Sequence, residues 1–309
     1  MTCSASSMTR SQGTTGVILA LGAYGWWGVV IPIYYHQLQD VAVLELVAWR
    51  VLSGLPVLLA MILLASRFRA MLGLLAKPRV MTLLLSSAVL IAVNWLVFIH
   101  AVDDNRLTEA SLGYYISPLL SVTIGMVVFG ERMRGLQWMA ISIAAIGVIV
   151  MAFQIGGLPW ISLILGGCFA LYGFIHKQVA ADAVMGLSIE MLMLFPVMIL
   201  LLGMVHAEEG AMIAGADGWM IMMLLLGGPI TVIQLLLFTG AVRRLHLSTV
   251  GILQYLAPTG QLLTAVLLLG EPLDAERLSA FCLIWTAVII YSWDTWRQAR
   301  ANMPVTVPE

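Results

Sequence analysis

Charge is scarce in this chain. Only 10% of its 309 residues are Asp, Glu, Lys or Arg, whereas 61% are hydrophobic. A soluble globular chain is about 25% charged and about 45–50% apolar, so these few charges cannot supply a water-facing shell. The net charge of −1 leaves no basic excess for binding nucleic acid. The composition therefore predicts a polytopic membrane protein and excludes a soluble enzyme and a disordered chain.

Cysteine is also scarce. The three residues are Cys3 near the N-terminus and Cys168 and Cys282 inside apolar runs. An odd count without a CxxC pair or clustered histidines argues against a disulfide framework and against a zinc site. GxSxG, HExxH, Walker A and GxGxxG motifs are missing as well. We therefore expect no catalytic residues, no bound metal and no cofactor.

Long apolar runs are what the chain has instead. A bilayer core about 30 Å thick is crossed by about 20 apolar residues in a helix. The runs show no apolar–polar alternation, which favours helices over the strands of a membrane barrel. The sequence thus predicts an all-α protein with ten transmembrane helices, at residues 16–35, 43–65, 80–101, 107–129, 136–153, 160–176, 187–205, 219–240, 247–269 and 277–296.

The basic residues predict the orientation. Most of the 15 Lys and Arg residues fall on one side of the membrane, and that side is cytoplasmic when the N-terminus is placed there. The tails at residues 1–15 and 297–309 are therefore both expected in the cytoplasm.

The sequence repeats itself at an offset of 140 residues. The segment Leu107–Pro118 matches the segment Leu247–Pro258. Five predicted helices thus correspond to the next five, and an odd number inverts the second set in the membrane. We expect two inverted repeats, at residues 16–153 and 160–296. Inverted repeats are the signature of secondary transporters.

Two prolines occupy matched positions in the middle of predicted helices. Pro118 and Pro258 are expected to break their helices, and paired breaks are a pointer to a midplane binding site. Tolerated helix kinks are the alternative. Glu131 and Glu271 follow the same two helices and are expected to mark turns at opposite faces.

The run from Asn94 to Trp138 resembles the RarD subfamily of EamA-type transporters, within the drug/metabolite transporter superfamily. Trp27-Gly28, Arg50 and Gln254-Tyr255 support the resemblance, which covers all ten predicted helices. It implies two EamA repeats in the bacterial inner membrane around a central cavity. It also implies the label of a chloramphenicol-sensitive protein or chloramphenicol resistance permease.

Arg50 is the only charge well inside a predicted span. An intramembrane Arg costs at least about 2.5–3.5 kcal/mol and should face protein or water. It could clamp a substrate carboxylate or act as a gate, or it could be structural or extend outward along the helix. Glu45 is a candidate partner, although its spacing of five residues does not put the two on one helical face.

Further polar and aromatic residues are candidates for the site. Glu45 and Glu190 are related by the repeat and are candidates for proton coupling, with helix N-terminal acids as the alternative. Amides could bind a polar substrate or join helices, and aromatic rings could hold a flat ligand or simply pack. The expected cavity residues besides Arg50 are Trp27, Asn94, Trp95, Tyr114, Tyr115, Tyr172, Gln234, Gln254 and Tyr255.

These features together predict a secondary transporter. It would move a small amphipathic metabolite or drug by alternating access, with export as the expected direction and proton antiport as one means of driving it. The expected partners are this small molecule and the lipid bilayer, with no nucleic acid. An intramembrane or lipid-modifying enzyme, and a membrane sensor, are the alternatives.

Overall fold

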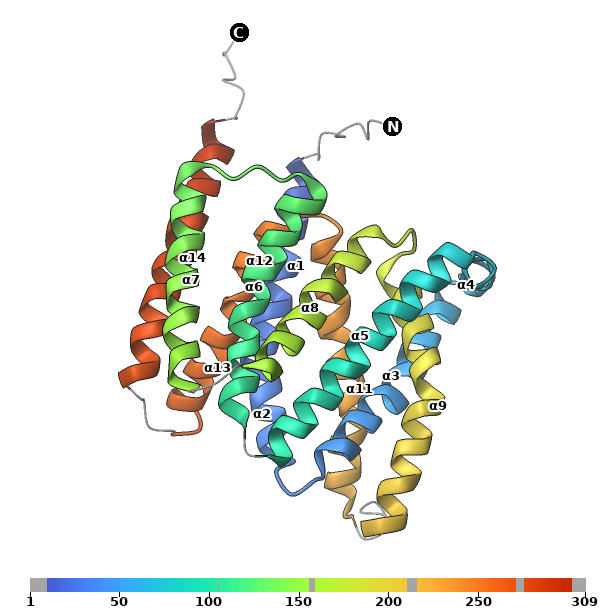
Figure 1. Ribbon diagram of the computed structural model, residues 1–309. Helices are drawn as coiled ribbons and strands as arrows, with labels where there is room; N and C mark the ends of the chain where they lie inside the picture. The colour runs from blue at the N-terminus through green and yellow to red at the C-terminus, as the bar shows by residue number, and fades with distance from the viewer. Residues whose placement is uncertain (1–9, 105, 156–158, 210–215, 271–274, 302–309) are drawn as a thin grey trace.

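The computed structural model describes residues 10–104, 106–155, 159–209, 216–270 and 275–301. Its helices are labelled in Figure 1. Their bounds are α1 Arg10–Gly25, the π-helical η1 Trp26–Val30, α2 Ile31–His36, α3 Val43–Leu64, α4 Phe68–Leu75, α5 Pro78–Asp103, α6 Leu107–Phe129, α7 Gly135–Ile155, α8 Trp160–Gln178, α9 Ala183–Glu209, α11 Gly218–Val242, α12 Leu247–Gln254, α13 Leu256–Leu267 and α14 Ala275–Ala301.

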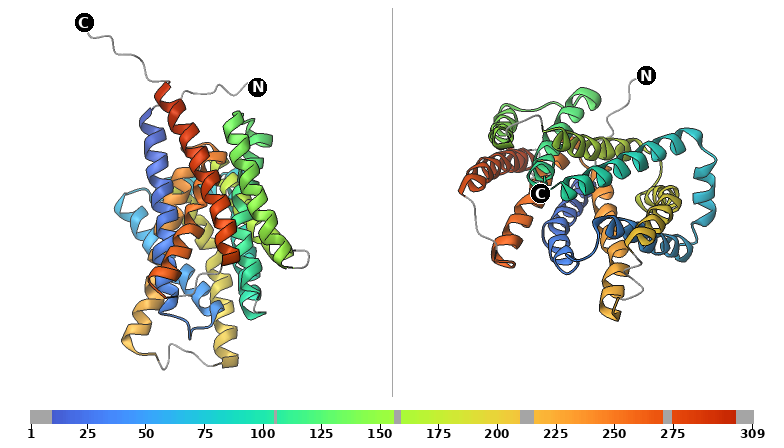
Figure 2. Two further views of the ribbon diagram at one scale, coloured as in Figure 1. Left: turned by 90° about the vertical axis from the view of Figure 1, so that its left-hand side faces the viewer. Right: turned by 60° about the horizontal axis from the view of Figure 1, so that its bottom comes forward.

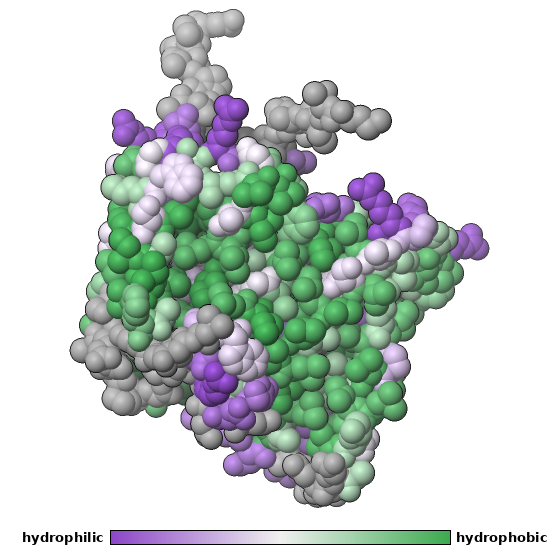
Figure 3. Space-filling view, in the orientation of Figure 1, coloured by the Kyte–Doolittle hydropathy of each residue, from purple (hydrophilic) through white to green (hydrophobic). Residues whose placement is uncertain are grey.

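The predicted all-α membrane fold is confirmed. Within the described residues, 9 helical segments are long and apolar enough to cross a bilayer, and α14 carries a shorter apolar stretch at Phe281–Thr295. Large apolar side chains such as Leu64 (87% exposed) and Phe153 (82% exposed) point outward, as expected of surfaces that face lipid. Hydrophobic residues cover the middle of the face in Figure 3, and hydrophilic residues gather toward its ends.

The two halves are inverted and interlocked. The start of α1 and the end of α14 lie at one end of the molecule, which we call the terminal face (Figures 1 and 2). Helix α3 begins at the opposite face, whereas its repeat counterpart α9 begins at the terminal face. Counterparts pack against each other in three pairs: α3 with α9, α6 with α12, and α7 with α14.

A pair of matched tyrosines joins the two repeats. The buried Tyr255 hydroxyl donates a hydrogen bond of 3.1 Å to the backbone carbonyl of Tyr115, its counterpart 140 residues earlier. Contact between equivalent residues is expected where two inverted halves meet at a pseudo-twofold axis. The axis thus passes close to α6 and the α12–α13 segment.

The first span contains a π-helical turn at Trp26–Val30. Pro32 has no backbone N–H, so it cannot donate to the carbonyl of Gly28 four residues earlier. Thr264 of α13 donates to this carbonyl, with its hydroxyl 3.1 Å from the Gly28 oxygen. Gly28 also touches Gly260 so closely that an added Cβ would lie 2.8 Å from the Gly260 Cα. The π turn is therefore fixed against α13.

The two matched prolines behave differently. Helix α6 continues through Pro118 to Phe129, so the expected break at this position is not observed. In the second half the helix is interrupted at Tyr255, three residues before Pro258. Gly251 of α12 packs so tightly on α6 that an added Cβ would lie 2.8 Å from the Pro118 carbonyl oxygen. This close contact packs α12 against α6 at the level of Pro118.

Replacing Thr264 by Val should lower the melting temperature of the purified protein. The variant keeps the shape but removes the buried hydrogen bond to the Gly28 carbonyl, a loss of about 1–3 kcal/mol. Thr264→Ser keeps the hydroxyl and is expected to retain most of the stability. Equal melting temperatures for the Val and Ser variants in detergent would contradict this role.

Candidate functional site

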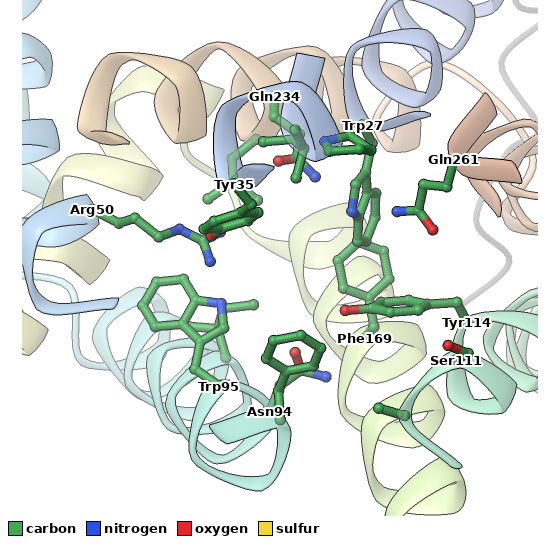
Figure 4. A pocket seen from close by; sticks show the side chains of 16 residues that line it. Trp27, Tyr35, Arg50, Asn94, Trp95, Ser111, Tyr114, Phe169, Gln234 and Gln261 are labelled. Atoms are coloured by element: carbon green, nitrogen blue, oxygen red, sulfur yellow. The ribbon is translucent and has the colours of Figure 1, made fainter. Parts of the chain in front are cut away.

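A cavity of about 310 Å³ lies between helices of both halves. Its volume is at the lower end of the range for small-molecule sites, about 300–1,000 Å³. Figure 4 shows side chains from several helices that converge on it. They are Trp27 and Tyr35 of the first span, Arg50 of α3, Asn94 and Trp95 of α5, Ser111 and Tyr114 of α6, Phe169 of α8, Gln234 of α11 and Gln261 of α13.

Aromatic rings separate the cavity from the terminal face. Trp27 packs against Phe169 with ring centroids 5.0 Å apart, and Phe169 packs against Phe238 at 4.9 Å. Closer to the terminal face, the rings of Phe129 and Phe174 lie 5.7 Å apart. The cavity residues on α5 and α6 lie near the end of α5 and the start of α6, which meet at the opposite face. The cavity therefore occupies the half away from the terminal face.

Arg50 is the only charged side chain among the described residues that line the cavity. Its Nε donates a hydrogen bond of 3.0 Å to the Thr231 hydroxyl, and its guanidinium carbon lies 5.0 Å from the Trp95 ring centroid. No ion pair joins it to a described carboxylate. Glu45 instead lies 3.4 Å from the His206 ring, because five residues of helix turn its side chain away from Arg50.

Three amides surround the same space. Asn94 donates a hydrogen bond of 3.0 Å to the Leu165 carbonyl and so joins α5 to α8. Its repeat counterpart Gln234 lines the cavity from α11, and Gln261 lines it from α13. Gln254 lies beside the cavity, in a small recess shared with Trp27 and Tyr114. Its buried Nε2 has no hydrogen-bond partner among the described residues.

Three expected cavity residues are placed elsewhere. Tyr115 packs edge-on against Phe281 in a second core cluster. Tyr255 is fully buried, and its hydroxyl donates a hydrogen bond to the Tyr115 carbonyl. Tyr172 is buried behind Phe169, with its hydroxyl 3.2 Å from Glu190. Their rings serve packing and helix joining, and none of the three is in the cavity lining.

Glu190 forms a separate buried polar cluster. Its carboxylate lies 2.9 Å from the His176 ring nitrogen and accepts the Tyr172 hydroxyl hydrogen bond. All three side chains are almost inaccessible to solvent. The cluster lies between α8 and α9, near the terminal face and beyond the aromatic rings. Among the described residues, no group of three or more His, Cys, Asp or Glu could hold a metal ion.

Ten of the 16 lining residues were missed by the sequence analysis, and five of these are aromatic or polar: Tyr35, Phe98, Ser111, Phe169 and Gln261. Gln261 follows Gln254 by seven residues, or about two helical turns, so a search along one helix face would have found it. Ser111 lies within the run that carries the family resemblance. The π turn, which has no clear pattern in the sequence, sets how Trp27 and Tyr35 face the cavity.

Comparison with known proteins identifies the family. A model of the EamA-like transporter family matches residues 14–153. A Salmonella typhi protein named RarD is 39% identical, over 93% of this chain and 97% of its own length. The chain belongs to the RarD subfamily of EamA-type transporters. An uncharacterized transporter from Vibrio cholerae is also 39% identical, over 94% of this chain and 96% of the relative.

A solved crystal structure shares the fold of this RarD-family chain. The two are 16% identical and superpose with a TM-score of 0.70, over 92% of this chain and 99% of the other. At this identity the likeness concerns the fold alone. The chain is thus a multi-pass membrane protein of a transporter family, with the EamA fold.

Glu131 joins the halves of this RarD-family protein at the terminal face. Its nearly buried carboxylate accepts hydrogen bonds from the backbone N–H groups of Leu247 (2.8 Å) and Ser248 (3.0 Å) and from the Ser248 hydroxyl (2.5 Å). It thereby caps α12, where a helix N-terminus favours negative charge. Glu131 is more than a turn marker; its counterpart Glu271 lies outside the described residues.

The capping bonds control the ionisation of Glu131. Burial alone would raise the pKa of this carboxyl above its ordinary value of 4.5. Hydrogen bonds from the His246 ring, the Ser248 hydroxyl and the backbone N–H groups of Ser248 and Leu247 outweigh burial and lower the pKa to about 2. The cap therefore stays charged at every physiological pH.

Glu131→Gln should lower the melting temperature at neutral pH, by a loss on the order of 2 kcal/mol. Because the folded-state pKa is depressed, the stabilisation is complete above pH 4.5 and disappears as the pH falls toward 2. The difference from the native protein should thus be constant from about pH 5 to 8 and shrink in stronger acid.

Asp217 offers a matched control for this prediction. It caps α11 in the same way, accepting the Met220 N–H at 2.8 Å, but it is exposed to water. Asp217→Asn should have a smaller effect, because water can replace an exposed cap. A Glu131→Gln deficit that vanishes between pH 8 and 6 would contradict the assignment of a strongly acidic cap.

Proposed function

We propose that this protein is a RarD-type secondary transporter of the bacterial inner membrane, which moves a small amphipathic solute by alternating access. The observation that carries the proposal is a cavity walled by both inverted halves and separated from one face by aromatic rings. In such folds substrates bind at the interface of the repeats, and exchange of their roles opens the site to the other side.

The orientation is part of the proposal. We assign the terminal face to the cytoplasm, because basic side chains such as Arg67, Lys177 and Arg243 gather there. The tails at residues 1–15 and 297–309, largely outside the described residues, would then be cytoplasmic. The repeats at residues 16–153 and 160–296 would form the two halves that exchange roles.

Polar contacts support closure toward the cytoplasm. Besides Glu131, side chains join different helices or their connections on the terminal face: Lys177 with the carbonyls of Val242 and Leu245, Arg243 with that of Ala181, Arg67 with Asp182 (2.8 Å) and Arg134 with Asp294 (2.5 Å). At the opposite face the described pairs are mostly within one segment, as for Arg106 with Glu109 and His100 with Asp104.

Glu190 and Glu45 are our candidates for proton coupling of export. Each lies against a histidine, Glu190 with His176 and Glu45 with His206. The two pairs lie toward opposite faces, since Glu190 is near the start of α9 and His206 near its end. A carboxylate–imidazole pair in a span is suited to taking up and releasing a proton as access changes.

Sided labelling of a cysteine in the cavity tests the proposal. Ser111→Cys, in a background without Cys3, Cys168 and Cys282, should react with a membrane-impermeant maleimide faster in right-side-out than in inside-out membrane vesicles. It should still react in both, because a carrier exposes one site to each side in turn. Ser87→Cys is the control, since this α5 side chain is fully buried and should stay unlabelled. Labelling of Ser111→Cys from one side alone would contradict alternating access.

A further inference from the structure

Arg50 places a positive charge in the cavity, and none of the described carboxylates forms an ion pair with it. The described lining residues include no carboxylate, so together they carry a net charge of +1. The Thr231 hydroxyl satisfies Nε, and no described carboxylate pairs with the two terminal nitrogens. A guanidinium inside a membrane is costly unless an anion or water compensates it. A negatively charged ligand could therefore neutralise the charge of Arg50.

A second arginine, Arg106, shows how a guanidinium is paired with a carboxylate in the same molecule. Arg106 lies over the Trp160 ring, 5.4 Å from its centroid, much as Arg50 lies 5.0 Å from the Trp95 ring. Arg106, however, also pairs with Glu109, with nitrogen and oxygen 2.6 Å apart. Arg50 has the same kind of aromatic contact, but no described acidic residue pairs with it. A fork of guanidinium donors matches a carboxylate in just this geometry.

The rest of the lining indicates the body of such a ligand. Tyr35 and Trp95 flank the guanidinium, and the rings of Trp27, Tyr114 and Phe169 lie across the cavity from it (Figure 4). Offset and edge-on ring contacts favour a flat aromatic group. The amides of Gln234 and Gln261 can satisfy one or two neutral polar atoms.

We infer that the substrate is an aromatic monoanion, whose carboxylate or similar group binds Arg50 while its ring enters the aromatic part of the cavity. This inference rests on the proposed function and names the substrate class of the same site. A zwitterion is disfavoured, because its ammonium restores the uncompensated positive charge and no described lining carboxylate accepts it.

Four indole compounds with similar shapes and different charges test this inference. Indole-3-propionate has the ring and the carboxylate, indole-3-propionamide is its neutral isostere, tryptophan adds an ammonium, and tryptamine is a cation. Binding of each in labelled form is measured on the full-length protein in lipid nanodiscs. Indole-3-propionate should bind at least about tenfold more tightly than any of the other three, as expected for a charge-assisted hydrogen bond.

Variants of Arg50 test whether this residue causes the preference for the anion. Arg50→Gln should bind indole-3-propionate and its amide equally, and Arg50→Lys should keep a reduced preference, since it has the charge without the fork. Arg106→Gln is the matched control and should keep the native preference, because Arg106 does not line the cavity. If Arg50→Gln fails to fold, the four-compound comparison on the native protein still decides.

Two results would overturn the inference: equal or tighter binding of the amide, tryptophan or tryptamine by the native protein, or binding of none of the four. Neither result bears on Ser111→Cys labelling, which needs no substrate. Two-sided labelling combined with a preference for the neutral amide would thus leave a transporter with a different substrate. One-sided labelling with tight anion binding would leave an anion-binding protein that does not alternate.

Discussion

A polar group inside a bilayer must find a partner in the protein, and this constraint organises the structure. Side-chain donors repeatedly bond backbone carbonyls of other helices: Thr264 to Gly28, Asn94 to Leu165, Tyr24 to Val250, Ser162 to Glu109 and Tyr255 to Tyr115. Each bond fixes the height and rotation of one helix against another, because hydrogen bonds are directional and hydrophobic contacts are not. In the cavity, Arg50 bonds the Thr231 hydroxyl and has no ion pair with a described carboxylate.

The all-α membrane fold could be predicted because it depends on local composition, and nine of the ten expected spans have a counterpart among the described residues that is long and apolar enough to cross a bilayer. Helix length follows from bilayer thickness, and the sense of each half follows from an odd number of spans. The π turn at Trp26–Val30 could not be predicted in this way. It depends on Pro32 and on a donor from Thr264, 236 residues away from Gly28. Pro118 and Pro258 likewise differ because of what packs against each, which the matched sequences do not reveal.

The sequence identified the cavity lining best where the residue type and its depth in the membrane were enough to indicate a role. Trp27, Arg50, Asn94, Trp95, Tyr114 and Gln234 all line the cavity. Tyr115, Tyr172 and Tyr255 do not, because which side of a buried helix faces the cavity is decided by its neighbours, and the spans are apolar all round. The role of Glu131 was missed for a similar reason: a cap on a helix more than 100 residues away leaves no local pattern.

The pairing of counterpart helices has a consequence for biosynthesis. The N-terminal half leaves the ribosome first, yet α3 and α6 find their packing partners only when α9 and α12 have been made. Arg50 also meets its hydrogen-bond partner late, because Thr231 lies 181 residues further along the chain. The spans of the N-terminal half therefore enter the bilayer before the helices that pack against them have been made.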